Sequence, residues 1–438
     1  MRPPRMRHNV PLNEHVRMWW WGGRGEVAHG VGVHGPDCHC VVREEYRRTV
    51  ADFETLRRAL AHKEGVPSAV AHSDGGARQW ISDELRGRAQ ELAAMRRAQG
   101  RAWLQVLGGR ALIVLWLLVA VLVLVQALTA IGAGWTGSRT AGIVAAVVVA
   151  GALSVVGWAA RASGGVFAPV RGLDGRLSTS KAVAALWMVA LMYCFAFLGM
   201  RLASASGDGE RDRLLERLGN VALDQITLVA APLLAAVAVR RIVGDKVGRR
   251  VLQKLRADQA SLRDLVTDDA GRASFVDAQY VLVNLVAVGF VVVGLARDPD
   301  RLPDIPATLV ALAVVSVITY LAGKLAENDR PVILSVVRVR TRGDLDSAVR
   351  QGDDIEVRGI NLAAGGSHEA DLLARVVVKF GAVHVHAPLI PADTGFANPS
   401  DACVVVPVPV DVEPGRVELC VVSASGVESA PYEIQIAG

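Results

Sequence analysis

The feature that most constrains this chain is an uninterrupted apolar stretch, Ala111–Ile131, which contains no charged residue. An α-helix rises about 1.5 Å per residue, so a stretch of this length covers the roughly 30 Å hydrocarbon core of a bilayer. Hydrophobic residues make up 52% of the chain and aromatic residues only 5%, so alanine, valine and leucine supply most of the apolar mass. This balance favours lipid-facing helices over one large soluble core. The sequence therefore predicts a protein embedded in a membrane.

Further apolar stretches follow the first, and together they predict an α-helical transmembrane bundle over residues 110–324. The six expected spans cover residues 111–131, 141–160, 182–200, 221–239, 278–296 and 305–323. The fourth is the weakest, because Ile226–Val239 reaches span length only with Val221–Leu223, and Asp224 and Gln225 lie near its boundary. If this segment did not cross, the C-terminal region would face outside.

Lysine and arginine are unevenly distributed among the connections between spans. The N-terminal flank and residues 161–181 and 240–273 are rich in both, whereas the alternate connections are poorer. Because cytoplasmic loops carry the excess of basic residues, we expect both chain ends in the cytoplasm. The net charge of +5 is explained in the same way, so no nucleic-acid partner is expected. Frequent alanine, valine, arginine and glycine suggest a GC-rich bacterial genome, and the plasma membrane is the expected location.

Two patterns indicate how the spans pack. Small residues recur every four positions in the second span, at Gly142, Ala146, Ala150 and Ser154, which gives a face that another helix can approach closely. A weak internal repeat relates residues 177–242 to residues 274–324, since each has a polar lead-in, a long span, a polar interval and a second span ending beside a basic residue. The repeat indicates either a duplicated helical hairpin or a chance similarity.

Polar side chains are rare in the expected spans. Gln126 and Asn284 are the main ones near mid-span, and Arg201, Asp224 and Asp277 lie near span ends. Transporters and proton relays usually place ionisable groups inside the bilayer. We therefore interpret these residues as helix-packing hydrogen bonds or boundary markers.

Residues 1–41 form an expected disordered N-terminal tail, rich in glycine, proline, arginine and histidine. Trp19–Trp21 is either an interfacial anchor or an unstructured apolar cluster. Five residues could in principle surround a zinc ion, but their Cys-x-Cys spacing is tighter than usual and no second ligand pair follows. These residues are His29, His34, Cys38, His39 and Cys40.

Residues 42–109 are predicted to form cytoplasmic amphipathic helices. Apolar residues in Val42–His62 recur three and four positions apart, with arginine and glutamate on the other side. Gly65–Ala77 breaks this pattern, and Arg78–Gly108 resumes it with an expected cap at Ser82–Glu84. The helices are either a hairpin or coiled coil that joins protomers into a homo-oligomer, or a docking surface for a protein partner.

Residues 331–438 change character and predict an all-β sandwich. The expected strands are Val332–Arg340, Asp354–Gly359, Ala374–Phe380, Val383–Ala387, Ala402–Val408, Arg416–Ser423 and Tyr432–Ala437. His384 and His386 share one face of a strand, and an ordinary surface pair is favoured over a metal site. Cys403 and Cys420 are expected on neighbouring strands but out of register, so buried free thiols are favoured over a disulfide.

Two segments of the bundle resemble a group of poorly characterised bacterial multi-pass proteins. The first, GLDGRLSTSKAVAALWMV, has a DGRLS lead-in and a tryptophan in the following span, and the second runs from Leu302-Pro303-Asp304-Ile305-Pro306 to Gly323-Lys324. The chain departs from the group at Ala182–Ala184 and Val314–Ser316. The resemblance spans about 150 residues and implies no known activity. The residues that fit the first segment are Asp174, Gly175, Arg176, Leu177, Ser178, Ser180, Lys181 and Trp187.

The last region also resembles an IPT/TIG domain, an immunoglobulin-like module. The resemblance implies binding of other proteins, sugars or nucleic acid, or a role as a spacer, in preference to catalysis. The segment Leu362–Leu373 departs from the pattern. The matching residues are Pro331, Ile333, Ser335, Val336, Gly352, Asp353, Ile355, Val357, Gly359, Asn361, Phe380, Gly381, Pro407, Gly415, Val417, Leu419, Val421, Ser425, Gly426, Glu428, Ser429, Tyr432 and Ile434.

No phosphate loop, dinucleotide-binding glycine motif, nucleophile elbow, zinc-protease motif or paired CxxC occurs in the sequence. We therefore expect no enzyme and assign no catalytic, cofactor-binding or metal residues. The leading hypothesis is a membrane scaffold whose helices 42–108 and domain 331–438 recruit a protein partner or tether a large assembly. A contractile injection apparatus is one example, although no residue specifies it. The alternative is an oligomeric channel or pore-forming effector gated by its soluble domains, and a third hypothesis is an outward-facing sugar receptor.

Overall fold

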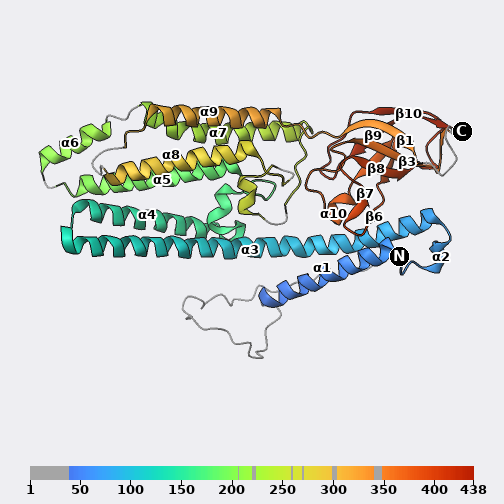
Figure 1. Ribbon diagram of the computed structural model, residues 1–438, viewed down its shortest axis with the longest axis horizontal. Helices are drawn as coiled ribbons and strands as arrows, with labels where there is room; N and C mark the ends of the chain where they lie inside the picture. The colour runs from blue at the N-terminus through green and yellow to red at the C-terminus, as the bar shows by residue number, and fades with distance from the viewer. Residues whose placement is uncertain are drawn as a thin grey trace, which may run out of the picture. The chain divides into compact units, whose positions relative to one another are not determined.

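The computed structural model describes residues 39–205, 207–219, 223–257, 260–268, 271–297, 303–339 and 348–438. Within these ranges an α-helical region with long apolar helices precedes a C-terminal β-sheet region (Figure 1), as the sequence predicts. Trp19–Trp21, His29, His34 and Cys38 lie outside the described residues. Of His39 and Cys40 only the helical backbone is described, at the start of α1.

The first helices are α1 (His39–Ala61), α2 (Ser68–Ala71) and α3 (Asp74–Ala133). Helix α3 is one continuous helix of 60 residues, so the predicted amphipathic helix and the first span are a single element. No proline interrupts it, and proline is the residue that most strongly breaks a helix. The expected cap at Ser82–Glu84 is wrong, because Ser73 caps the helix and accepts a hydrogen bond from the Gly76 amide at 3.2 Å.

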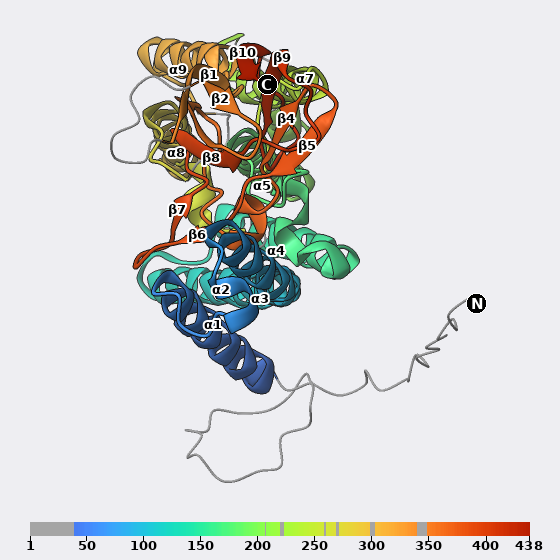
Figure 2. The same cartoon turned by 90° about the vertical axis from the view of Figure 1, so that its right-hand side faces the viewer.

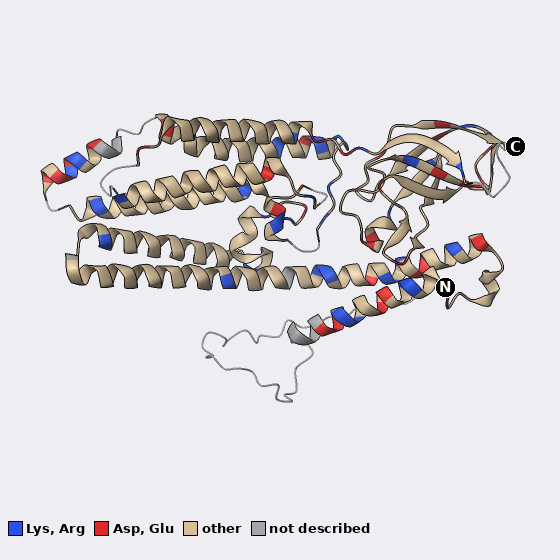
Figure 3. Cartoon of the chain, viewed as in Figure 1, with Lys and Arg blue, Asp and Glu red and all other residues tan. Residues whose placement is uncertain are grey.

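The remaining bundle helices are α4 (Gly137–Ala159), α5 (Thr179–Ala203), α7 (Leu223–Gly248), α8 (Phe275–Arg297) and α9 (Ala307–Ala326). A short polar helix, α6 (Asp208–Gly219), connects α5 to α7. With α3, six described helices are long and apolar enough to cross a membrane. The uncertain fourth span is among them, because its helix continues past Val239 to Gly248. Figure 3 shows charged residues gathering toward the ends of these helices.

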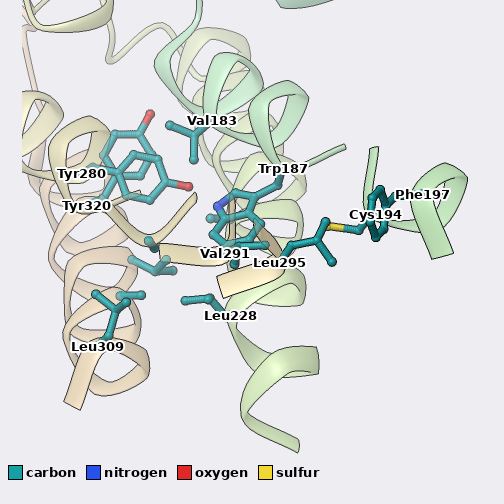
Figure 4. Close-up of a cluster of buried hydrophobic side chains, with 14 of the residues drawn as sticks. Val183, Trp187, Cys194, Phe197, Leu228, Tyr280, Val291, Leu295, Leu309 and Tyr320 are labelled. Carbon is teal, nitrogen blue, oxygen red and sulfur yellow. The ribbon is translucent and has the colours of Figure 1, made fainter. Parts of the chain in front are cut away.

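Helices α5, α7, α8 and α9 share one hydrophobic core, in which Trp187 and Leu228 are almost fully buried (Figure 4). Each packs against two of the others: α5 contacts α7 and α8, and α9 contacts α7 and α8. Tyr280 and Tyr320 stack within this core, with ring centroids 4.3 Å apart and planes 3° apart. The helix pair α5 and α7 therefore lies beside the pair α8 and α9, with α5 against α8 and α7 against α9.

Helix α4 packs between α3 and α5, and its small residues explain why. A Cβ at Gly142 would lie 3.7 Å from the ring atoms of Phe197 and the hydroxyl of Tyr193 on α5, and Ala150 is fully buried. On the other side, the Trp116 indole of α3 donates to the Ser154 hydroxyl at 3.1 Å. Small residues of the predicted face therefore pack at two contacts, Gly142 against α5 and Ser154 against α3.

A short hairpin precedes both α5 and α8, and the two hairpins are built alike. In the first, the Gly172 amide donates to the Arg176 carbonyl at 2.8 Å, and in the second the Asp268 amide donates to the Arg272 carbonyl at 2.8 Å. Gly175 and Gly271 occupy the same left-handed position of the two turns, with φ of 86° and 77°. Each hairpin follows a 3₁₀ helix, η2 (Gly165–Val170) or η3 (Leu262–Leu265). The same turn before both helices supports duplication over chance similarity.

The β region contains two main sheets. One has the strand order β1-β3-β8, and the other has the order β2-β10-β9-β4-β5. A third sheet pairs only β6 with β7. Valines, leucines and Phe380 from both main sheets fill one buried core, since alternate residues of each strand point inward. The strands are β1 (Val332–Arg338), β2 (Val349–Arg350), β3 (Asp354–Ile360), β4 (Val377–Phe380), β5 (Val383–His386), β6 (Ile390–Pro391), β7 (Phe396–Asn398), β8 (Cys403–Pro407), β9 (Gly415–Val422) and β10 (Tyr432–Ala437).

The predicted strands are all present with small changes in their ends, and three short strands, β2, β6 and β7, are additional. Strands of two or three residues carry too little periodicity to be read from sequence. The segment Leu362–Leu373, which departs from the IPT/TIG pattern, ends in a single helical turn, α10 (Ala370–Leu373). This turn contacts α3, so the departing segment serves a contact within the chain.

Helices α1 and α3 pack against the β region, with α3 facing β6 (Figures 1 and 2). Phe53, Ile81, Leu85 and Leu92 of the two helices form one apolar cluster with Leu389 and the α10 segment. We call this unit, residues 43–100 together with the described residues of 331–438, the platform. The apolar stripe that the sequence offers to an outside partner is therefore used inside the chain.

Candidate functional site

A cavity of about 570 Å³ lies at the end of the bundle nearest the platform. Its walls are the start of α5, the second half of α7, the end of α9 and the two hairpins that precede α5 and α8. Ligand-binding cavities in proteins commonly have volumes of roughly 300–1,000 Å³. A smaller cavity of about 360 Å³ shares Arg176 and Arg256 with it and reaches α3 and the α10 segment.

Lys324 is the central cation of the bundle end. Its ammonium lies 2.6 Å from a carboxylate oxygen of Glu327 and 3.5 Å from a carboxylate oxygen of Asp277. Asp277 is 2% exposed and also accepts a hydrogen bond from the Ser274 hydroxyl. A buried carboxylate needs a partner of this kind because removing a charge from water is costly. Both Asp277 and Lys324 face the cavity.

The end of α9 is also held by α7. The Lys246 ammonium donates to the backbone carbonyls of Lys324 at 3.0 Å and Leu325 at 2.6 Å. The last carbonyls of a helix have no partner within it, and a lysine is favoured there by the helix dipole. This contact fixes the direction in which the chain leaves α9 for β1, which begins at Val332.

The two related hairpins differ in how they start their helices. Before α8, Ser274 accepts from the Asp277 amide at 3.2 Å while its hydroxyl donates to the Asp277 carboxylate, which closes the helix end. Before α5, Ser178 makes no such side-chain bond, and the position equivalent to Asp277 is Lys181. The first turn of α5, Thr179–Lys181, lines the cavity. The first copy of the repeat therefore presents an uncapped helix start to the cavity.

Arg57 fixes the platform. It is 3% exposed, and its guanidinium donates to the backbone carbonyls of Ala392, of Gly395 at 2.9 Å and of Asp393 at 3.3 Å, all in the β6–β7 turn. Glu54, one turn earlier on α1, accepts from the same guanidinium at 2.6 Å. The arginine satisfies carbonyls that the tight turn leaves without strand partners.

Helix α3 makes three further polar contacts with the β region. Arg78 lies 2.7 Å from Asp354, and Arg96 pairs with Glu369 and also donates to the Tyr46 hydroxyl. Ser82, the expected cap, is instead buried and accepts from the Leu389 amide at 2.9 Å. Its hydroxyl replaces a missing strand partner for that amide.

The structure assigns different positions to the polar residues that the sequence singles out in the spans. Asn284 is buried and accepts from the Trp187 indole at 2.9 Å, so its interpretation as a packing hydrogen bond is confirmed. Gln126 is half-buried on α3, and its backbone carbonyl accepts from Arg139 at 2.9 Å. Asp224 is exposed in the first turn of α7. Only Asp277 among them reaches the cavity.

The histidine and cysteine candidates are dispersed. His384 and His386 are exposed on β5, and among the described residues no group of three or more metal-ligand side chains is found. The expectation that Cys403 and Cys420 lie on neighbouring strands is wrong, and so is their expected full burial, whereas the expectation of free thiols is confirmed. β8 pairs with β3 and β9 with β4 and β10, so the two thiols lie in different sheets, partly exposed and free. Strand order rather than chain order decides which strands are neighbours.

No protein-family model matches the chain, and neither the curated proteins nor the solved structures contain a significant match.

The sequence alone does not predict the cavity. Most of its charged residues lie in or beside the connections, in residues 171–181, 240–256 and 264–277, and Lys324 and Glu327 lie at the end of α9. A usable signal was present, because both lead-ins contain Gly-Arg-x-Ser, at Gly175–Ser178 and at Gly271–Ser274. The repeat of residues 177–242 and 274–324 begins after the shared glycine and arginine, so it does not include this signal.

Proposed function

We propose that the protein is a non-catalytic membrane anchor that holds a binding platform at the membrane surface and recruits a protein partner or large assembly to it. The observation that carries this proposal is the continuity between the two parts. Helix α3 runs without a break from the platform into the first candidate span, and only five residues separate α9 from β1. A platform held at two points by structured connections suits the transmission of force or position better than one on a flexible linker.

We also propose that residues 331–438 form an immunoglobulin-like domain of the IPT/TIG kind. With the strands lettered in chain order, β1, β3 and β8 correspond to A, B and E of one sheet, and β10, β9, β4 and β5 correspond to G, F, C and C′ of the other. This order supports the proposal, because immunoglobulin-like sandwiches divide their strands in the same way. Domains of this class commonly bind through sheet edges or loops, which favours a protein partner.

The free edge of the five-stranded sheet is the surface we assign to the partner. Strand β5 ends the sheet and exposes His384 and His386, whereas the apolar side of α1 and α3 is already covered by the β region. An edge strand offers unpaired backbone groups to an incoming strand. The recruitment surface therefore differs from the amphipathic stripe that the sequence suggested.

Photo-crosslinking in intact cells tests this proposal with the full chain. A photoreactive amino acid is placed at His384 or His386, and for comparison at Arg213 on α6, which connects the far ends of α5 and α7. We expect a discrete protein adduct from the two β5 positions and none from Arg213. Adducts from all three positions alike, or from none of them in correctly inserted protein, would contradict recruitment through the platform.

Topology is tested separately with single cysteines and a membrane-impermeant maleimide applied to bacterial cells. We propose that the platform faces the cytoplasm, so H384C stays unlabelled until the membrane is permeabilised, whereas R213C is labelled at once. The opposite labelling would place the platform outside and would favour a receptor for an external ligand.

A further inference from the structure

The charged residues that line the cavity at the bundle end are not balanced once their internal contacts are counted. All five acidic side chains of the wall have a partner within the protein. Asp174 pairs with Lys254, Asp268 with Arg272, and Asp277 and Glu327 with Lys324. Asp264 accepts from the amides of Leu177 at 3.1 Å and Ser261 at 2.9 Å. These carboxylates are therefore satisfied without a ligand.

Four cations of the same wall have no carboxylate partner among the described residues: Arg176, Lys181, Arg240 and Arg256. Arg176 and Lys181 donate only to backbone carbonyls, of Asp268 at 3.4 Å and of Arg171 at 2.8 Å. In this wall every carboxylate is paired, whereas the four cations have no carboxylate partner in the described part of the chain. These four cations therefore attract an anion that enters the cavity, and no described carboxylate of the protein neutralises their charge.

The uncapped start of α5 adds a second and independent donor set. Its first-turn residues line the cavity, the Ser178 side chain does not cap them, and Lys181 replaces the capping aspartate of the related hairpin. The amides at a helix start carry a partial positive charge and bind phosphate oxygens readily. The duplicated copy before α8 has its helix start closed by Asp277.

The opposite wall of the cavity is apolar. Val239, Val243 and Val247 recur every four residues along α7 and face the cavity beside Gly244, whose missing side chain leaves room. An inorganic anion alone makes no use of such a wall. A ligand with a charged head and an apolar part fits both walls, and the cavity lies at the end of candidate membrane spans.

We propose that this cavity binds a phosphate mono- or diester, with the phosphate at the start of α5 beside Arg176 and Lys181 and the remainder of the ligand along α7. Two sources carry this chemistry, the headgroup of an anionic phospholipid and a water-soluble phosphorylated molecule. The inference does not depend on the anchor function, because it concerns residues outside the platform surface.

The test uses full-length protein purified in detergent and two triple variants of equal charge change. R176Q/R240Q/R256Q removes three cations that line the cavity. R241Q/R249Q/R263Q removes three exposed arginines of residues 240–273 that do not line it. Phosphatidylglycerol, and diacylglycerol as its phosphate-free analogue, are titrated and bound lipid is counted by native mass spectrometry. Inorganic phosphate and glycerophosphoglycerol are titrated in parallel, with the thermal midpoint as the readout.

We expect the wild type and the exposed-arginine variant to bind phosphatidylglycerol alike, and the cavity variant to bind it roughly tenfold or more weakly, since each lost contact is charge-assisted. A midpoint shift from the soluble phosphates, lost only in the cavity variant, supports the same site with a soluble source. Equal loss in both triple variants shows diffuse attraction only and overturns the proposal, as does undiminished binding by the cavity variant. If the triple cavity variant does not fold, K181Q is compared with R241Q under the same criteria.

Discussion

Trp187 of α5 donates its indole hydrogen to the side-chain carbonyl of Asn284 on α8 across 2.9 Å, and both side chains are 1% exposed. The amide group of Asn284 in turn donates to the Tyr280 carbonyl at 2.8 Å on its own helix. This is a polar contact inside the hydrophobic core that joins the two similar helix pairs, α5 with α7 and α8 with α9. The contact fixes the rotation of α5 about its axis relative to α8, because Trp187 and Asn284 meet only when these faces of the two helices are opposed.

Removing this contact should loosen the bundle without changing its composition elsewhere. For W187F and N284L we expect a loss of stability, with about 0.6 kcal/mol and at most about 1.7 kcal/mol coming from the hydrogen bond itself. A double-mutant cycle on SDS-induced unfolding of the purified protein separates that part from lost packing. Additive effects of the two substitutions would show that the hydrogen bond contributes nothing.

Arg57 should control the order of the β6–β7 turn. In R57M the carbonyls of Ala392, Asp393 and Gly395 lose their donor, and we expect a destabilisation of about 2 kcal/mol because the bonds come from a charged group. Hydrogen exchange of residues 388–398 should become faster in this variant. R58M is the matched control, since the neighbouring Arg58 is exposed. Equal exchange in both variants would remove Arg57 from this role.

The related glycines of the two hairpins should respond differently to alanine. Both have left-handed backbone conformations, so G175A and G271A each cost about 1 kcal/mol in strain. At position 175 the new Cβ would also lie 2.8 Å from the Ala257 carbonyl oxygen, whereas nothing lies within 4 Å at position 271. We expect a clearly lower thermal midpoint for G175A than for G271A. A lower midpoint for G271A would contradict the described contact between residues 175 and 257.

Burial, and then the nearby Glu356 carboxylate, raises the pKa of the Cys403 thiol from 9.0 to about 11. The folded protein therefore keeps a proton that the unfolded chain loses, so this group lowers stability as the pH rises from about 9 to 11 and has no effect below that window. Alkylation of Cys403, followed by peptide mass spectrometry, should be slow at pH 8 and should still rise at pH 10. In urea-unfolded protein the same peptide should titrate near the ordinary thiol pKa. A folded-state midpoint near 9 would show that the thiol is not shielded.

The extent to which the sequence predicts this fold differs between its parts. Span positions follow from hydrophobic length alone, which is why Ile226–Val239, despite Asp224 and Gln225, lies in a helix of spanning length. Strands in which apolar and polar residues alternate, such as Tyr432–Ala437, can likewise be predicted from the sequence. The sequence does not predict that helix α3 continues through Gly108 and Gly109. Glycine is only a weak helix breaker, and its effect depends on the surrounding contacts.

The candidate site cannot be predicted from the sequence for a different reason. A cavity wall built from Arg176, Arg256 and Lys324 depends on how two separate connections meet the end of α9, and no local sequence pattern predicts that meeting. The same holds for the platform, where the stripe on α1 and α3 predicts burial but does not name the β region as the partner. Amphipathicity identifies the face of a helix that is covered and leaves open what covers it.

The unbroken course of α3 sets an angle as well as a separation. Its 60 residues span about 90 Å, and each residue turns the helix by about 100°. The direction in which Arg78 points toward β3 therefore determines the direction in which Trp116 points toward α4. One residue inserted between these two positions would swing the near half of the helix through more than a quarter turn. The segment between them is therefore intolerant of insertions and deletions, at its exposed positions as well as at its buried ones.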